Sequence, residues 1–489
     1  MLLLGIDVGT SFIKVSVVNA QTKKCIASTQ YPEKEVAIIS LQSDWAEQSP
    51  EFWWQHVQHA ILKANALKAY DPKDIAAIGI SYQMHGLVCV DKNKNVLRKA
   101  IIWCDSRAVS LGAKAFQAIG EEKCLSHLLN SPGNFTASKL AWLRKYEPEI
   151  YAQIDKIMLP GDFIAMKFTD EITTTISALS EGIFWDFKND NLSEDVFNYF
   201  GFDKNFIPDI HPVFSTHGML SKKVAEILSL KENIPVSYKA GDQLNNALSL
   251  NVLKPGEVTA NAGTSGVIYA VSHQLSYDIH SRINSFAHVN YTSQQKKIGV
   301  LLCINGAGIL NRWIKNLSVN KTYAELNDEA ANINAGSDGL FILPFGNGAE
   351  RMLNNKIVGS QILNIDLNKH TAAHIYRAGQ EGIAFAFKYG LDIMGENGIK
   401  PSVIRAGKAN MFLSNVFVET LVNTTNIPVE LYDADGSLGA GIGAGIGAGI
   451  FTIKNAFSNI NSLGLFEPNN PEMYKHLYNE WKQLLQQYL

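Results

Sequence analysis

Two segments, one at the start of the chain and one just past its middle, repeat the same arrangement of residues. Each has an apolar run, then Gly-Thr-Ser, then a second apolar run: Leu2 to Val18 around Gly9-Thr10-Ser11, and Glu257 to Val271 around Gly263-Thr264-Ser265. Apolar runs rich in β-branched residues predict two buried strands joined by a tight turn. Glycine lacks the Cβ that blocks close approach, and the backbone N–H groups and hydroxyls of such a turn can grip phosphate oxygens. One such turn is typical of any hairpin, but two, each opening one half, indicate phosphates held between two domains.

The length of the chain also favours two domains. At 489 residues it exceeds what one hydrophobic core organises, and 46% hydrophobic with 18% charged residues is a normal globular balance. The composition changes after Glu232, so we expect an N-terminal domain over residues 1–236 and a C-terminal domain over residues 237–489. The last segment, Pro471 to Leu489, predicts a helix that packs either on its own half or back on the first domain.

Charge and cysteine content exclude several classes of partner. The formal net charge of -3, with no basic stripe interleaved with aromatic residues, argues against nucleic acid. The five cysteines are scattered without a CxxC pair, which indicates reduced thiols and a cytoplasmic protein. No window approaches the ~18 apolar residues of a membrane span, and the first apolar run is too short for a signal sequence. We therefore expect no membrane partner either.

A glycine-rich segment, Gly439 to Ile450, repeats Gly-Ala-Gly-Ile. Each helical glycine costs ~1 kcal/mol relative to alanine, so two structures compete: a loop, or a helix whose glycines allow very close backbone packing. Ile442, Ile446 and Ile450 stand at i, i+4 and i+8, which favours the packed helix. The glycines are out of register for a dinucleotide fingerprint, and Gly407-Lys408 lacks the flanking residues of a P-loop, so neither common nucleotide motif is present.

Two acidic residues are candidates for chemistry. Asp7 ends the first predicted strand, where its carboxylate is suited to hold a magnesium ion through the water shell of the ion. The alternative is a turn carboxylate bonded to its own backbone. Asp242 lies where a strand from Ile234 gives way to a helix, so the alternative there is an ordinary N-cap. Phosphoryl transfer needs one carboxylate for the metal and another for the attacking hydroxyl, and this pair meets that need.

The order of these motifs resembles the FGGY carbohydrate kinases from residue 2 to about residue 450. Ile6 to Lys14 resembles the first phosphate loop of that family, Ala240-Gly241-Asp242 its catalytic-base segment, and Asn261 to Ser265 its second phosphate loop. Further matches are Gly79 to Gly86 and Ile102 to Arg107, which resemble the branch acting on xylulose, and Leu343 to Phe345, Gly348 to Arg351 and Glu381 to Phe385. The resemblance implies an α/β fold of two ribonuclease H-like domains, as in actin and the heat-shock chaperone ATPases, with the active site in the interdomain cleft.

The resemblance also implies a role for each matched residue. Asp242 would be the catalytic base that accepts the proton of the sugar hydroxyl, and Asp7 would anchor Mg²⁺. His85 would bond sugar hydroxyls and Trp103 would offer an apolar face to the carbon chain; the alternatives are a satisfied buried histidine and a core aromatic residue. The full sets are Gly9, Thr10, Ser11, Lys14, Gly263, Thr264, Ser265, Gly407, Lys408 and Asn410 for ATP, and Gln83, Met84, His85, Trp103, Asp105 and Asp242 for the sugar.

The implied reaction transfers the γ-phosphate of ATP to the terminal hydroxyl of a ketopentose, with D-xylulose, giving D-xylulose 5-phosphate, as the first expectation. Other members of the family act on ribulose, rhamnulose, gluconate or glycerol, and a non-catalytic sugar- or nucleotide-binding protein is a separate class. These alternatives stay open because Ala406 and Lys408 interrupt the glycine-rich segment usual at the adenosine, and Cys104 replaces an asparagine. The expected partners are a small sugar and ATP, and a homodimer is left open as the oligomeric state.

Overall fold

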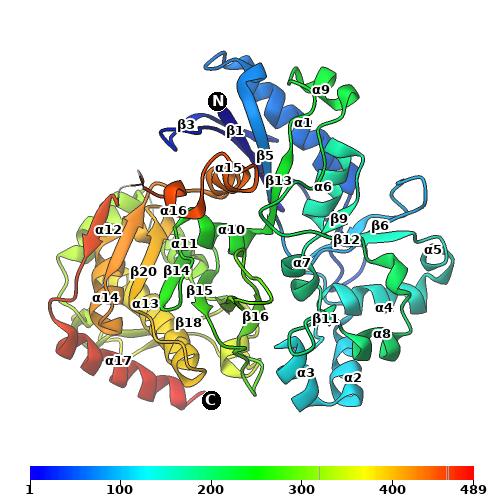
Figure 1. Cartoon of the computed structure of the whole chain (residues 1–489). Coiled ribbons are helices and arrows are strands. Elements are labelled where there is room, and N and C mark those ends of the chain that lie inside the picture. Colours follow the sequence, from blue (N-terminus) through cyan, green and yellow to red (C-terminus); the bar gives the residue numbers. More distant parts are fainter. Residues whose placement is uncertain (319, 459, 461) are drawn as a thin grey trace.

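A computed structural model describes residues 1–318, 320–458, 460 and 462–489 of the chain. The chain forms two α/β lobes, each built around its own sheet (Figure 1). Both sheets contain the same core, in which three antiparallel strands are followed by two strands parallel to the first. The duplicated strand–turn–strand that the sequence predicts is therefore the start of a duplicated sheet.

The first sheet is five-stranded, in the order β13-β5-β1-β2-β3. Its strands are β1 (Leu2–Val8), β2 (Ile13–Asn19), β3 (Cys25–Tyr31), β5 (Ile75–Tyr82) and β13 (Val236–Gly241). Successive side chains of a strand point to opposite faces, so Leu2, Leu4 and Ile6 pack against helix α1 (Pro50–Ala66) while Leu3 packs against α15 (Gly436–Gly447). The sheet is thus covered on both faces, by one helix from each half of the sequence.

The glycine-rich segment is helical as far as Gly447, as predicted, with Ile450 beyond the end of the helix, and it rests directly on the first sheet. A Cβ on Gly79 of β5 would lie 2.0 Å from the carbonyl oxygen of Ala440, and a Cβ on Gly447 would lie 1.7 Å from that of Ser237 in β13. Only glycine permits backbones to meet at these distances. The unusual composition of α15 is therefore explained by helix–sheet contact without intervening side chains.

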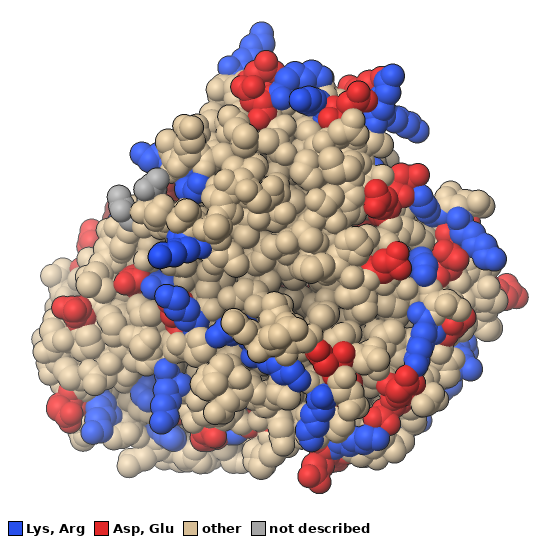
Figure 2. Space-filling model, in the orientation of Figure 1, with Lys and Arg blue, Asp and Glu red and all other residues tan. Residues whose placement is uncertain are grey.

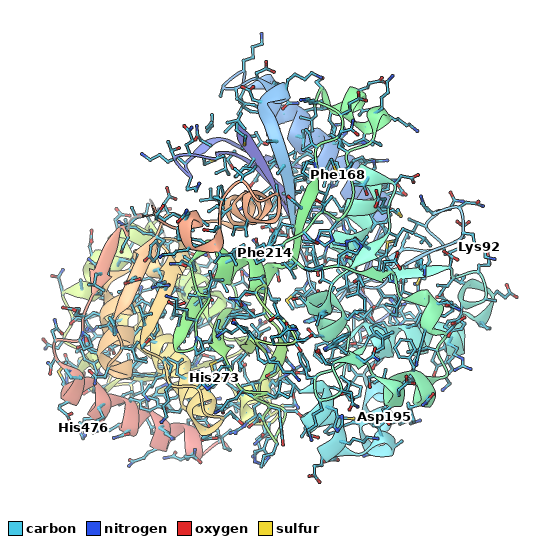
Figure 3. The ribbon with its side chains drawn as sticks, in the orientation of Figure 1. Lys92, Phe168, Asp195, Phe214, His273 and His476 are labelled. Carbon is cyan, nitrogen blue, oxygen red and sulfur yellow. The ribbon has the colours of Figure 1, made fainter. Side chains whose placement is uncertain are left out.

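The rest of the first domain extends beyond this sheet, and only some of its helices contact the sheet strands. Figure 3 places Phe168 in its interior, where its ring meets Trp54 edge-on at 4.9 Å, and Phe214 nearer the second lobe, where it stacks on Tyr238 of β13 at 5.4 Å. The helices are α2 (Val109–Ile119), α3 (Glu121–Leu128), α4 (Thr136–Tyr146), α5 (Pro148–Tyr151), α6 (Pro160–Thr169), α7 (Ile176–Glu181), α8 (Glu194–Phe200) and α9 (Lys222–Leu228). Short strand pairs are β4 (Glu47–Gln48) with β7 (Ala100–Ile101), β6 (Val88–Val90) with β8 (Lys156–Met158), β9 (Thr173–Thr174) with β12 (Asp209–Ile210), and β10 (Trp185–Asp186) with β11 (Asn191–Leu192).

The second sheet is seven-stranded, in the order β16-β17-β15-β14-β20-β21-β22. Its strands are β14 (Glu257–Ala262), β15 (Gly266–Ser272), β16 (Asn284–Ala287), β17 (Ile298–Ile304), β20 (Val403–Gly407), β21 (Val429–Tyr432) and β22 (Gly464–Phe466). The helix α10 (Asp242–Ser249) links the two sheets and packs chiefly against α15. Around the second sheet lie α11 (Gly308–Leu317), α12 (Tyr323–Ala331), α13 (Ala372–Glu396), α14 (Asn415–Thr425), α16 (Ile453–Ala456), α17 (Pro471–Gln486) and the pair β18 (Phe341–Phe345) with β19 (Gly359–Leu363). None of the helices in the described part of the chain is long and apolar enough to cross a membrane.

The expected domain boundary needs correction, and the position of the C-terminal helix was left open by the sequence. The expected boundary after residue 236 falls at the start of β13, yet β13 completes the first sheet by pairing with β5, so we infer that the domain change comes later, after α10. The C-terminal helix α17 does not pack back on the first domain. It packs against α13, α14 and β18, where the indole of Trp481 donates to the carbonyl oxygen of Ile342 at 2.9 Å (Figure 1).

Side chains of the first domain cover the edge strand β16 of the second sheet. Asn130 donates from Nδ2 to the carbonyl oxygen of Ser285 (2.7 Å) and accepts from its N–H (3.0 Å), as a neighbouring strand would. Ser180 accepts from the N–H of Ala287 at 2.9 Å. The two lobes are therefore joined at β16 by hydrogen bonds between side chains and backbone.

Candidate active site

The first Gly-Thr-Ser turn follows Asp7 at the end of β1. Ser81 donates to Oδ1 of Asp7 at 2.7 Å, and Lys14 lies opposite Asp7 in the β1–β2 register. Burial, and secondarily the nearby carboxylate of Asp435, raises the pKa of Asp7. A Cβ on Gly436, the first residue of α15, would lie 2.4 Å from Oδ2 of Asp7, so a larger residue than glycine would clash with this oxygen. Asp7 is thus a crowded acidic site rather than a turn carboxylate bonded to its own backbone.

Asp7 has the surroundings expected of a residue that binds a hydrated cation. No salt bridge to a described Lys or Arg neutralises it, and the described residues contain no group of three or more His, Cys, Asp or Glu side chains arranged to hold a metal. Mg²⁺ typically keeps several waters and takes only one or two carboxylates from the protein. The enclosed carboxylate of Asp7, with that of Asp435 nearby, fits that pattern.

Thr10 of this turn is held by a hydrogen-bond network. Its hydroxyl donates to Oε1 of Gln83 (3.2 Å) and accepts from the indole N–H of Trp103 (3.0 Å). Gln83 in turn donates to Oε1 of Gln48 at 3.1 Å, and Gln48 donates to the carbonyl oxygen of Thr10 at 2.8 Å. Gln83 is buried and its amide is engaged at both ends, so it helps to position the phosphate turn, and its expected contact with sugar stays a prediction.

Trp103 has the opposite environment. Its side chain is 51% exposed, which excludes the core aromatic alternative. The N–H bond to Thr10 fixes one edge of the ring and leaves the face open. Trp103 therefore connects the segment expected to bind sugar with the turn expected to bind phosphate.

Asp242 begins α10 directly after β13. Burial, followed by the charge of Asp7, raises the pKa of Asp242 to about 7. The two carboxyl groups that the sequence singled out are therefore close enough to repel each other. A base with a pKa near the operating pH is well suited to take a proton from a hydroxyl and release it afterwards.

His85 follows Met84 on the loop after β5. Its Nδ1 is 3.2 Å from the carbonyl oxygen of Glu181, and its ring lies between Phe135 at 4.8 Å and Phe286 at 5.3 Å. Burial lowers the pKa of His85 to about 3, so the ring is neutral. Because Nδ1 must carry the proton to donate to a carbonyl, Nε2 is left as a hydrogen-bond acceptor. The preceding Met84 is buried.

Met84 brings this loop against the catalytic-base segment. A Cβ on Gly241 would lie 2.6 Å from Cγ of Met84 and 3.2 Å from Oε2 of Glu181. The loop that carries His85 therefore packs directly on the residue before Asp242. The Met84–His85 loop thus lies next to Asp242 in the chain fold, and sugar binding by these residues stays a prediction.

Asp105 has a buried, hydrogen-bonded carboxylate. It is fully buried, and its oxygens accept from the N–H of Ala46 at 2.6 Å and from the guanidinium of Arg107 at 2.6–3.0 Å. Arg107 also pairs with Glu47 at 2.8 Å. Asp105 therefore anchors the Trp103 loop, and its expected role as a polar partner of the sugar stays a prediction.

A pocket of about 310 Å³ adjoins the second Gly-Thr-Ser turn. Its lining comprises Ala262, Gly263, Thr264, Gly308, Asn311, Arg312, Tyr323, Asn327, Tyr376, Gln380, Asn410, Met411, Leu413 and Ser414. Of the residues expected to bind ATP, Gly263, Thr264 and Asn410 line it, whereas Ser265, Gly407 and Lys408 do not. Small residues at the turn and amides on the walls suit a nucleoside base and ribose.

The walls of this pocket come from helices that the sequence gave no reason to select. Ser414 donates to Oε1 of Gln380 at 2.6 Å, and Gln380 donates to Oδ1 of Asn327 at 2.8 Å. These residues belong to the start of α14, to α13 and to α12. On the face in Figure 2, charged side chains lie mainly around the rim, and the hollowed middle between the lobes carries few.

Comparison with known proteins identifies the family. The N-terminal domain of the FGGY family of carbohydrate kinases matches residues 2–249, and its C-terminal domain matches residues 258–448. The xylulose kinase of Haemophilus influenzae is 30% identical over 411 residues, covering 82% of this chain and 81% of that protein. The xylulose kinase of Escherichia coli is 28% identical over 404 residues, covering 82% and 80%.

Solved structures agree on the fold. The xylulose kinase from Rhodospirillum rubrum has a TM-score of 0.88 at 22% identity, covering 100% of this chain and 99% of the other. Plasmodium falciparum glycerol kinase with ADP has a TM-score of 0.89 at 20% identity, covering 100% and 98%. The expected two-domain α/β fold is therefore confirmed. With both domains matched in order, the chain belongs to the FGGY family of carbohydrate kinases.

Proposed function

We propose that the protein is an ATP-dependent ketopentose kinase that converts D-xylulose to D-xylulose 5-phosphate. The observation that carries the proposal is the buried Asp242 carboxyl, whose pKa is raised to about 7 by burial and by the charge of Asp7, directly after Gly241, on which the Met84–His85 loop packs. The choice of sugar is supported by curated relatives named xylulose kinase, which are 25–30% identical to this chain. A gluconate kinase from Lactobacillus acidophilus has the same fold with a TM-score of 0.87, so the sugar must be tested against alternatives.

The chemistry at the sugar follows from three side chains. Asp242 accepts the proton of the terminal hydroxyl while the hydroxyl oxygen bonds to the γ-phosphorus and the bond from that phosphorus to the leaving ADP oxygen breaks. Nε2 of His85 accepts a hydrogen bond from another sugar hydroxyl, and the exposed face of Trp103 covers the carbon chain. These contacts orient the hydroxyl, which is most of what catalysis of phosphoryl transfer requires.

The chemistry at the phosphates follows from the two turns. Gly9, Thr10 and Ser11 from one lobe, with Thr264 and Ser265 from the other, offer backbone N–H groups and hydroxyls to the β- and γ-phosphates. The pocket beside Gly263 holds the adenosine. Mg²⁺ held by Asp7 through water would supply the positive charge that neutralises these phosphates.

The cellular setting is part of the same proposal. All five cysteines are free thiols, which suits the reducing cytoplasm. The partners are the sugar and ATP, without nucleic acid or membrane. The homodimer that the sequence left open is tested by light scattering on the purified protein.

The test is an ADP-release assay with MgATP and a panel of D-xylulose, L-xylulose, D- and L-ribulose, L-rhamnulose, gluconate and glycerol. Wild type should turn over D-xylulose fastest. Asp242→Asn keeps the size of the side chain but cannot take the proton, so the rate should fall by about 10²–10⁴-fold while calorimetric ATP binding is retained. Asp209→Asn, on the exposed strand β12, is the matched control.

Each failure of this assay has its own meaning. Faster turnover of another member of the panel would replace D-xylulose as the substrate. Absence of sugar-dependent turnover in wild type would favour a non-catalytic member of the family. An active Asp242→Asn protein would refute the role of this carboxyl as base.

A further inference from the structure

His85 has a backbone conformation that few residues adopt. Its φ of +62° lies in the left-handed region, which costs a residue with a side chain of order 1 kcal/mol or more. Such conformations persist where surrounding contacts hold them, and they concentrate at ligand sites. The contacts that hold His85 are therefore informative about its function.

The carbonyl oxygen of His85 is held by a buried lysine. Nζ of Lys139, on α4, donates to this oxygen at 2.8 Å, and the side chain of Lys139 is fully buried. Among the described residues this is the one hydrogen bond that Nζ makes. On its other side, His85 is held by the bond from Nδ1 to the carbonyl oxygen of Glu181. The peptide and the ring of His85 are thus fixed from two directions.

Burying an amino group for one backbone carbonyl is costly, and the reaction described above makes no use of Lys139. Burial lowers the pKa of Lys139 to about 7, partly offset by the carboxylate of Asp105, so the folded protein gives up stability to keep the group there. An apolar side chain of similar length would fill the space without that cost. A buried amino group that lowers stability is expected where it has a function. The geometry points to one function for Lys139, which is to hold the carbonyl of His85.

We propose that Lys139 is a positioning residue of the sugar site: it holds the peptide of His85 in its left-handed conformation, so that Nε2 faces the sugar as a hydrogen-bond acceptor. The proposal rests on the proposed function, in which His85 binds sugar. Under this proposal, replacing Lys139 changes the affinity for sugar and not that for ATP, because the residue lies in the first domain, away from the adenosine pocket of the second.

The competing explanation is structural. Lys139 also lies near the carboxyl groups of Asp105 and Glu181 and near the cation of Arg107, so it contributes to the charge balance of the first domain. In that case replacing Lys139 would lower stability and activity without a preference for sugar binding and without dependence on His85. A double-mutant cycle separates the two explanations.

The experiment measures calorimetric Kd and KM for D-xylulose and for ATP, with thermal midpoints, in wild type, Lys139→Met, His85→Ala and the double variant. Lys139→Met should weaken D-xylulose binding about five- to tenfold, the effect of one lost hydrogen bond, with ATP binding unchanged. In the His85→Ala background the same substitution should have no further effect on sugar affinity. Lys139→Gln, which keeps an N–H donor of slightly shorter reach, should recover part of the loss.

Lys156→Met is the matched control, because Nζ of Lys156 also donates to backbone carbonyls, those of Asn205 (2.6 Å) and Ile207 (3.2 Å), outside the cleft. It should leave sugar affinity unchanged. If Lys139→Met does not fold, the cycle is run with Lys139→Gln, and a smaller loss of the same kind is expected.

Two results would overturn the proposal. Equal losses from Lys139→Met with and without His85 would show a structural role, as would equal losses of sugar and ATP binding. If His85→Ala itself binds D-xylulose normally, His85 is not the sugar contact and Lys139 has nothing to position. Failure of the proposed function is seen separately, since wild type would then show neither binding nor turnover of any sugar in the panel.

Discussion

The contact between α15 and the first sheet predicts that one substitution, glycine to alanine, has opposite effects at two helix ends. Gly447 is the last residue of α15, and Gly395 is the last but one of α13. A Cβ on Gly447 would lie 1.7 Å from the carbonyl oxygen of Ser237, whereas a Cβ on Gly395 would have nothing within 4 Å. An ordinary contact begins at 3.4 Å, so at Gly447 helix and strand must separate by about 1.7 Å.

The magnitudes follow from two opposing terms. Alanine is favoured over glycine in a helix by ~1 kcal/mol at both sites. At Gly447 the overpacking cost is expected at or above the ~3 kcal/mol end of its usual range, because the clashing atom is backbone and cannot rotate away. Gly447→Ala should therefore destabilise by about 2 kcal/mol, and Gly395→Ala should stabilise by about 0.5–1 kcal/mol. For domains of this size each kcal/mol moves Tm by roughly 2–4 °C, so we expect a fall of about 4–8 °C and a rise of about 1–4 °C.

The assay is thermal unfolding followed by circular dichroism, at one scan rate and protein concentration for all variants. Sugar-dependent turnover is measured alongside, because Ser237 lies on β13, which leads directly into Asp242. Gly447→Ala should lose activity below its melting temperature, whereas Gly395→Ala should not. Shifts of the same sign in both variants, or an unchanged Tm for Gly447→Ala, would refute the close contact between α15 and β13.

Three further predictions concern the site. Asp242 must be ionised to take a proton, so with its pKa raised to about 7 the value of kcat/KM should fall as pH drops below about 7 and level off above it; a flat profile between about pH 5.5 and 8.5 would contradict this. Asp105→Asn breaks the buried pair with Arg107 and should cost about 3–5 kcal/mol in a urea titration, whereas weaker sugar binding at unchanged stability would support Asp105 as a sugar contact. Ser414→Ala removes the N-cap of α14 and the bond to Gln380, so it should cost about 1 kcal/mol and raise KM for ATP but not for sugar; equal changes in both KM values would contradict the placement of the nucleotide.

The features that the sequence predicted correctly depend on residues close together in the chain. The strand–turn–strand units are fixed by apolar runs around Gly-Thr-Ser, and the helix of α15 by the spacing of Ile442 and Ile446. The strand-to-helix junction at Asp242 was predicted from a local pattern and is present, while the role of Asp242 as base stays a prediction. Local patterns of this kind predict the structure correctly because the tertiary contacts favour the same local conformation.

The features that were missed depend on partners distant in sequence. Gln83 and Asp105 stand in segments that resemble a sugar site, and their hydrogen bonds to Thr10, Gln48 and Ala46 could not be read from those segments. In the sequence, Lys139 is one lysine of a predicted helix. Only its burial and its hydrogen bond to the His85 loop suggest that it positions that loop. β13 was assigned to the wrong domain because a buried parallel strand carries no mark of which sheet it joins.

The pairing of Asn130 with Ser285 bears on how the protein behaves when its lobes separate. An uncovered edge strand presents free N–H and C=O groups that can pair with another chain. Here the cover is a set of side chains from the opposite lobe, so the protection lasts only while the lobes stay together. Ligands that span the cleft would then have a second effect, suppressing self-association, and the solubility of the protein would rise and fall with the supply of its own substrates.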